Sequence, residues 1–205
     1  MGFGIWRLAI ELTGVWFGMM AAMMAPVVFP WILAFDRFGA GRPASIGRAL
    51  STISFAGGYL VAWLSWAIAA AQLQMLLMRL GNTDAMHEVA PTAGATILMV
   101  AGAYQFAPLK RACLTHCRNP LTYYLTRWRD GVFGGFRMGL GHGVYCVGCC
   151  WALMATALAA GMMNLWWMAS LAVVAFVEQV VPRGDLIRVP LGVALVIAGV
   201  VRLTA

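Results

Sequence analysis

Long apolar stretches separated by short polar segments run through almost the whole chain. The stretches that qualify as candidate membrane spans are 12–35, 51–78, 89–109, 144–160, 162–181 and 189–203. A helix needs about 20 apolar residues to cross the hydrocarbon core of a bilayer, and the last stretch needs a snorkelling Arg202 to reach that length. The alternating ten-residue strands of outer-membrane barrels are absent from the pattern. The sequence therefore predicts an all-α, polytopic transmembrane helix bundle with about six spans.

Composition narrows the class of protein further. Hydrophobic residues make up 62% of the chain and charged residues only 10%, whereas about a quarter of the residues of a soluble protein are charged. A soluble enzyme, a disordered regulator and a secreted disulfide scaffold are therefore excluded. The net charge of +7 would suggest nucleic acid in a soluble protein, but here the basic residues lie between apolar runs. We expect the lipid bilayer as a partner, and no nucleic acid.

The basic residues concentrate in alternate loops. The loops after the first, third and fifth candidate spans hold most of the 14 lysines and arginines. The second loop has more acidic than basic residues, and the fourth has no charge. Because cytoplasmic loops carry the excess of positive charge, the odd loops are predicted to be cytoplasmic and both termini to lie outside. We treat residues 1–205 as a single integral membrane domain.

The third loop, 110–131, is polar, basic and rich in aromatic residues, which is typical of a segment lying at the membrane interface. We predict that it forms a cytoplasmic interfacial segment between the third and fourth spans. It contains Cys113, His116 and Cys117. On a helix, residues three and four apart share one face, so these three side chains can act together.

A second group of thiols follows in the fourth span. His142, Cys146 and Cys150 are spaced four residues apart, and Cys149 lies on the same side of a helix. Thiolate and imidazole ligands suit Cu(I) or Zn(II). We therefore predict a metal site, with copper as Cu(I) preferred and zinc as the alternative. Its candidate ligands are Cys113, His116, Cys117, His142, Cys146, Cys149 and Cys150.

Whether the two groups form one site depends on where the fourth helix begins. A helix starting near Val132 would place Cys146 about 20 Å along its axis, which separates the groups. If 131–143 is instead an interfacial segment, Cys146 lies near the cytoplasmic face and can meet the loop thiols. We favour the single site. The spacing of Gly135, Gly139 and Gly143 also predicts a small-residue face for close helix packing.

Methionines in the first span are a second candidate for soft-metal binding. Met19 lies one helical turn before Met23, and Met20 one turn before Met24. Thioethers bind Cu(I) without losing a proton, which suits a path through a low-dielectric medium. The alternative is that these flexible side chains only fill space between helices.

Other interpretations of the thiols stay open. A buried cysteine can act as a small hydrophobic residue, and the spacing of Cys146 and Cys149 also occurs in dithiol oxidoreductases. A non-catalytic structural subunit is a third possibility. No Ser-His-Asp set, phosphate-binding glycine loop or intramembrane carboxylate pair is present, so we do not expect an enzyme. Glu178 is the ionisable residue of the fifth span, and we expect it to pair with a loop arginine.

Two motifs carry a resemblance to a known family. The first is Q-x2-P-L-K-x2-C-x3-C-R-x-P, starting at Gln105, and the second is Y-C-x-G-C-C-W, starting at Tyr145. Together they resemble a bacterial family of predicted metal-binding integral membrane proteins, catalogued as a domain of unknown function. The resemblance covers nearly the whole chain and implies that all five cysteines bind metal.

These observations together lead to a functional expectation. We expect a multi-pass protein of the bacterial inner membrane that handles a transition metal, as a chaperone, an assembly factor or an accessory subunit of a membrane metalloenzyme. Such a role predicts a membrane protein partner. The alternatives are thiol-disulfide exchange at Cys146 and Cys149, or a purely structural role.

Overall fold

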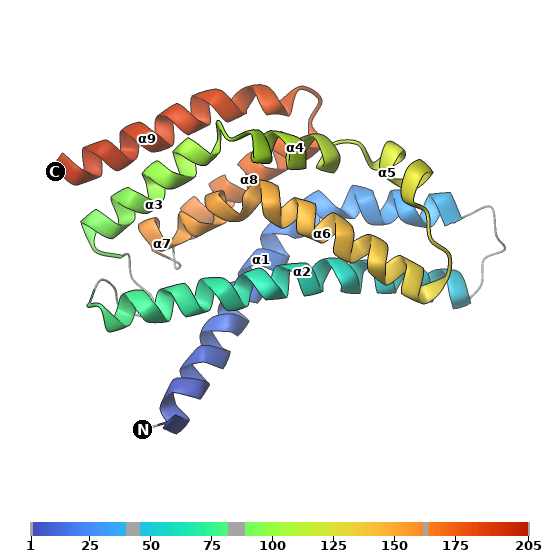
Figure 1. Cartoon of the computed structure of the whole chain (residues 1–205), viewed down its shortest axis with the longest axis horizontal. Helices are drawn as coiled ribbons and strands as arrows, with labels where there is room; N and C mark the ends of the chain where they lie inside the picture. Colours follow the sequence, from blue (N-terminus) through green and yellow to red (C-terminus); the bar gives the residue numbers. More distant parts are fainter. Residues whose placement is uncertain (1, 40–45, 82–88, 162–163, 205) are drawn as a thin grey trace.

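A computed structural model describes residues 2–39, 46–81, 89–161 and 164–204, and the regular structure of these residues is entirely helical (Figure 1). The helices are α1 (Gly2–Phe38), α2 (Ile46–Arg79), α3 (Pro91–Tyr104), α4 (Pro108–Cys117), α5 (Pro120–Arg127), α6 (Gly131–Ala155), α7 (Ala157–Ala160), α8 (Leu165–Val180), the 3-10 helix η2 (Gly184–Ile187) and α9 (Arg188–Thr204). The predicted all-α class is confirmed for these residues. Parts of three loops used to predict orientation, at 40–45, 82–88 and 162–163, lie outside them.

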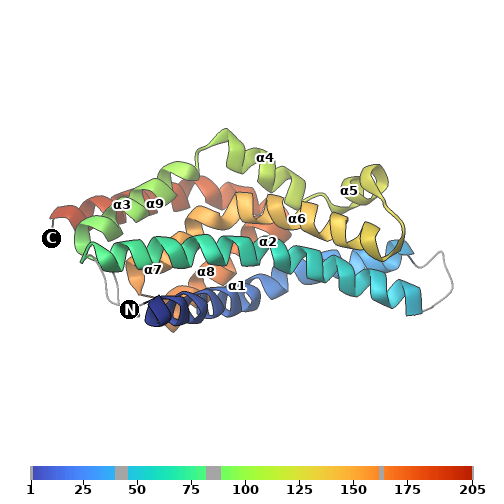
Figure 2. The ribbon, with the colours of Figure 1, turned by 60° about the horizontal axis from the view of Figure 1, so that its bottom comes forward.

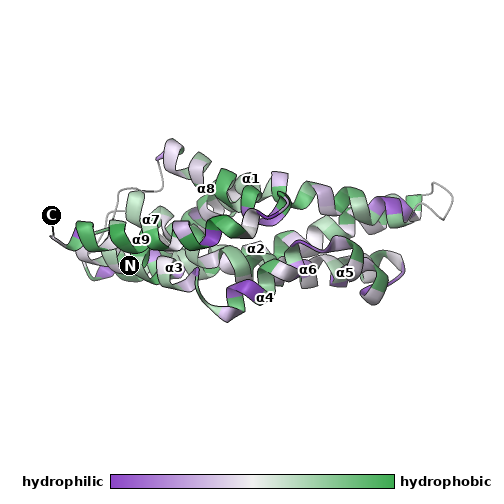
Figure 3. Cartoon of the chain, turned by 90° about the horizontal axis from the view of Figure 1, so that it is seen from above, coloured by the Kyte–Doolittle hydropathy of each residue, from purple (hydrophilic) through white to green (hydrophobic). Residues whose placement is uncertain are grey.

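Three helices of the described chain are long and apolar enough to cross a membrane: Gly4–Phe38, Ile46–Arg79 and Gly131–Ala160. Helix α8 is apolar but shorter, and α3 and α9 have 14 and 17 residues. Each predicted span overlaps at least one helix, with different bounds, and the number of crossings remains a prediction. Large apolar side chains are exposed along the outer faces of the bundle. Figure 3 shows apolar residues covering most of the helices, with a strongly polar patch on α4.

Glycines allow α2 and α6 to lie unusually close together. A Cβ atom at Gly139 would stand 1.8 Å from the backbone oxygen of Phe55, and one at Gly143 would stand 2.7 Å from Cβ of Ala62. A Cβ at Gly135 would likewise meet the backbone of Ser51 at 2.4 Å. These distances leave no room for a side chain, which confirms the predicted small-residue face. The backbone contact fixes which residues of α2 face the middle of α6.

The start of the fourth span was predicted wrongly. Helix α6 begins at Gly131 and runs without interruption to Ala155, so 131–143 is not a separate interfacial segment. The segment predicted to lie at the membrane interface, 110–131, contains most of α4 and the whole of α5. Pro108 and Pro120 stand at their first positions, where the missing N–H and the fixed φ angle favour helix initiation. Figures 1 and 2 show α4 lying beside α6, with α5 beyond it.

Helix α1 carries two prolines in its interior, Pro26 and Pro30. A proline inside a helix removes a backbone hydrogen bond and bends the helix, and Figure 1 shows α1 changing direction along its length. The residue after the second proline, Trp31, is buried. Its indole N–H donates a hydrogen bond to the carbonyl oxygen of Cys117, at 3.1 Å. The C-terminal half of α1 is thereby attached to the end of α4.

Because the α2–α6 contact leaves no space at Gly139, we expect Gly139→Ala to lower the free energy of unfolding by about 1–3 kcal/mol, the usual cost of overpacking. Thermal unfolding in detergent, followed by circular dichroism, measures the change. Gly57→Ala is the matched control, since a Cβ at this position of α2 meets nothing within 4 Å. Equal destabilisation of both variants would show that the contact is not tight.

Candidate metal centre

Four thiols from two helices meet in the interior of the protein. Cys117 ends α4, and Cys146, Cys149 and Cys150 lie in the middle of α6. The sulphur of Cys149 is 3.9 Å from that of Cys117 and 3.6 Å from that of Cys150. All four residues are buried, and all are free thiols. The structure therefore brings one cysteine of the first sequence group against the second group, as the single-site interpretation requires. We call these four residues the thiol cluster.

Two neutral polar side chains contact the sulphurs of the thiol cluster. The hydroxyl of Tyr59, on α2, lies 3.3 Å from Sγ of Cys146. Gln179, on α8, donates from Nε2 to Sγ of Cys150 at 3.0 Å and accepts from the thiol of Cys146 at 3.5 Å. Tyr59 and Gln179 were missed by the sequence analysis. The only sequence signal for Gln179 was its position next to Glu178, the ionisable residue of that span.

The sulphur distances can be compared with those of a metal–thiolate site. Sulphurs placed about 2.3 Å from a tetrahedral metal are about 3.8 Å apart, close to the two distances in the thiol cluster. However, in the described part of the chain no group of three or more His, Cys, Asp or Glu side chains is already arranged around a common metal position. Pairs of thiols thus stand at ligand spacing, and a set of three ligands would require side-chain rotation.

Cys113 and His116 occupy the side of α4 next to the thiol cluster. The thiol of Cys113 packs against Gly148, where a Cβ would stand only 2.9 Å from its sulphur. Burial raises the pKa of this thiol. The ring of His116 stacks on Tyr145 with centroids 3.7 Å apart, and its buried Nε2 has no hydrogen-bond partner among the described residues. Burial, followed by the charge of Arg127, lowers the pKa of His116, which favours the neutral imidazole that binds metals.

His142 lies one helical turn before Cys146 and is completely buried. Its ring stacks on that of Trp31, with centroids 3.6 Å apart. The ring of Tyr59 also stacks on it, with centroids 5.6 Å apart. Neither ring nitrogen has a hydrogen-bond partner in the described residues. A buried polar atom without a partner is rare and costs free energy. An imidazole in this state, beside thiols, is chemically suited to bind a metal ion.

Comparison with known families agrees with this donor chemistry. The sequence profile of the PpoB2 family, described as a copper chaperone, matches residues 13–202. The chain belongs to this copper chaperone family. No match was found among curated proteins or among solved structures. The family assignment supports copper handling in general, and the buried thiols and imidazoles are donors of the soft and borderline kind that Cu(I) prefers.

The methionines of the predicted path lie on two faces of α1. Met20 and Met24 are fully buried in the core, whereas Met19 and Met23 line an apolar groove between α1 and α8 together with Met168. Gln179, which contacts the thiol cluster, is 11 residues after Met168, or about 16 Å along a helix. Met19 and Met23 thus face the groove between α1 and α8, and their part in metal binding stays a prediction.

A buried ion pair lies beside the thiol cluster. Nζ of Lys110, on α4, is 2.7 Å from Oε2 of Glu178, on α8, and neither side chain is accessible. The expectation that Glu178 pairs with a loop arginine was wrong. Helix α4 packs against α6 and α8, and this packing places Lys110 against Glu178. The pair connects the helix that supplies Cys117 to the helix that supplies Gln179.

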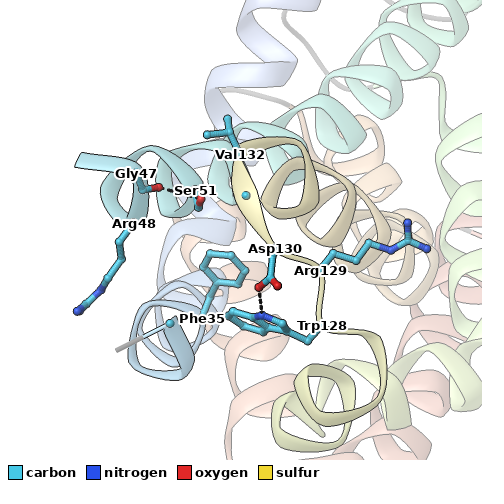
Figure 4. A pocket seen from close by; sticks show the side chains of 10 residues that line it. Phe35, Gly47, Arg48, Ser51, Trp128, Arg129, Asp130 and Val132 are labelled. Atoms are coloured by element: carbon cyan, nitrogen blue, oxygen red, sulfur yellow. Dashed lines mark hydrogen bonds between the residues drawn. The ribbon is translucent and has the colours of Figure 1, made fainter. Parts of the chain in front are cut away.

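A further hollow, of about 260 Å³, lies near the ends of α1, α2 and α6 (Figure 4). Phe35, Arg48, Trp128 and Asp130 line it. The Trp128 indole donates to the Asp130 carboxylate at 2.7 Å. No thiol or imidazole faces this hollow, so it is separate from the candidate metal centre.

Removing one member of a buried ion pair leaves a charge without compensation, which costs about 3–5 kcal/mol. We expect Lys110→Met to destabilise the protein by this amount, and the double variant Lys110→Met/Glu178→Gln to recover much of the loss. Thermal unfolding in detergent measures both. Arg48→Met serves as a control, since the Arg48–Asp36 pair is partly exposed and such pairs contribute little. A double variant no more stable than the single one would contradict the prediction.

Proposed function

We propose that this protein binds Cu(I) through the thiol cluster and passes it to a membrane protein partner in the bacterial inner membrane. The observation that carries the proposal is the 3.9 Å separation of the sulphurs of Cys117 and Cys149, on two different helices. Copper is the cargo of such a protein. Its task is that of a chaperone, an assembly factor or an accessory subunit of a membrane metalloenzyme.

The surroundings of the thiol cluster fit a monovalent soft ion. Cysteine binds metals as the thiolate, so uptake of Cu(I) displaces protons from the thiols. The hydroxyl of Tyr59 and the amide of Gln179 lie within hydrogen-bond distance of Cys146 and Cys150. Donors to sulphur stabilise its negative charge and orient it. They do so without adding a full positive charge, and two thiolates with Cu(I) carry only one net negative charge.

The two histidines are additional ligands in this proposal. His142 precedes Cys146 by one turn, and His116 precedes Cys117 directly. Both keep a buried ring nitrogen without a partner in the described residues. Cu(I) needs only two or three ligands. A site with more donors than this can therefore hold the ion with one set of ligands after another. Exchange between such sets lets the ion move to a partner without leaving a soft environment.

Elemental analysis of protein purified anaerobically in mild detergent tests the proposal. The wild type is expected to hold about one copper ion per chain, because the thiols converge on one centre. Cys146→Ser/Cys150→Ser should abolish binding. Cys113→Ser should have a smaller effect, since its sulphur packs against Gly148. Met19→Leu/Met23→Leu, in the separate groove, is the control and should retain copper.

Other outcomes separate the competing functions. Zinc in place of copper, lost in the same variants, would keep the site but change the ion. No metal, together with a reversible disulfide and a mixed disulfide trapped in single-cysteine variants, would indicate thiol-disulfide exchange. No metal and five titratable thiols would contradict the proposal and leave a structural role.

A further inference from the structure

Two adjoining open hollows, of about 530 and 560 Å³, lie along α5, the first between α4 and α5 and the second between α5 and α6. Tyr123, Thr126 and Arg127 line both. His116 lines the first hollow, whereas Arg129 and Arg137 line the second. We call this surface the arginine face and define it by Arg127, Arg129 and Arg137. All three of these arginines are exposed.

The arginine face has no acidic residue in its described lining. None of the side chains that line the two hollows is acidic, and no ion pair within the described residues involves any of the three arginines. The nearest acidic residue in sequence, Asp130, binds Trp128 in the separate hollow, and Figure 4 shows the side chain of Arg129 directed away from it. The face therefore presents three positive charges to the surroundings.

His116 connects the arginine face with the thiol cluster. His116 lines the first hollow and is only half-buried, yet its Nε2 atom is buried without a partner. The next residue, Cys117, is buried and contacts Cys149. His116 is therefore the residue that connects the lining of the first hollow with the thiol cluster.

Charge decides in what form copper can arrive at this surface. A cluster of like charges repels ions of its own sign and raises the local concentration of ions of the opposite sign. A bare copper cation is therefore disfavoured at the arginine face. Guanidinium groups instead bind carboxylates, in paired hydrogen bonds of matching geometry. The hollows also have the size of sites that hold small molecules.

We propose that the arginine face receives Cu(I) as an anionic complex with a small carboxylate-bearing thiol, and that the ion passes by His116 to Cys117. This inference rests on the proposed function. The segment is predicted to be cytoplasmic, where low-molecular-weight thiols are kept reduced. The carboxylates pair with Arg127, Arg129 and Arg137, which holds the copper at the hollow.

The transfer is a ligand exchange that balances without an added reactant. The bond from copper to the sulphur of the small thiol breaks, and a bond from copper to Sγ of Cys117 forms. The proton lost by the Cys117 thiol goes to the departing thiolate. Copper remains Cu(I) throughout, so nothing is oxidised or reduced.

The test compares two copper donors that share one sulphur ligand. Apo-protein in detergent is mixed anaerobically with Cu(I)–glutathione or with Cu(I) bound to glutathione diethyl ester, whose carboxylates are blocked. Protein-bound copper is measured against time by rapid desalting and elemental analysis. The wild type should load about tenfold faster from the acid form at low salt, since steering raises association rates by at least this factor. Added salt should remove the advantage.

Variants locate the effect on the surface. Arg127→Gln/Arg129→Gln/Arg137→Gln should load equally slowly from both donors while reaching the wild-type copper content at equilibrium. Arg7→Gln/Arg37→Gln/Arg79→Gln removes the same charge from exposed residues outside the hollows and should keep the wild-type preference. A wild-type rate in the first variant, or an equal loss in both, would overturn the inference. A wild type that takes up no copper from either donor would overturn the proposed function instead.

Discussion

The close approach of α2 to α6 is the constraint on which the rest of the structure depends. Gly139 allows the backbone of α6 to touch that of α2 near Phe55, and the same contact places Tyr59 against Cys146 and beside His142. A side chain between the two helices would separate the hydroxyl from the sulphur. The glycine face of α6 thus determines which polar side chain of α2 contacts the thiol of Cys146.

Three further polar contacts, made by side chains of α1, α8 and α4, position the thiol cluster. Trp31 of α1 donates to the backbone of Cys117, Gln179 of α8 contacts two thiols, and Lys110 pairs with Glu178. Buried polar groups that are fully paired specify one arrangement, because any other leaves them unsatisfied. Both ring nitrogens of His142 and Nε2 of His116 are among the buried polar atoms that lack a partner in the described residues, and such atoms beside a cluster of thiols commonly mark function rather than packing.

The sequence predicted those features that depend on spacing within one helix. The helical class, the glycine face of α6 and the grouping of Cys146, Cys149 and Cys150 on one side all follow from helical periodicity. The contacts made by Cys117, Lys110 and Gln179 depend on how separate helices pack, and periodicity does not specify that. The assumption that a continuous α6 must separate the two thiol groups failed because α4 folds back along α6. Met19 and Met23 have the helical spacing of a ligand pair, and only the packing of α1 against α8 shows that they line a groove between these helices.

The thiol cluster draws its members from positions 32 residues apart, Cys117 and Cys149. An unfolded chain holds these two sulphurs far apart on average, so an ion bound to both acts as a removable cross-link. Binding that occurs only in the folded state stabilises that state in proportion to the logarithm of ligand concentration. The supply of copper would therefore govern how long each chain resists unfolding and proteolysis, and the amount of carrier in the membrane would follow the amount of cargo.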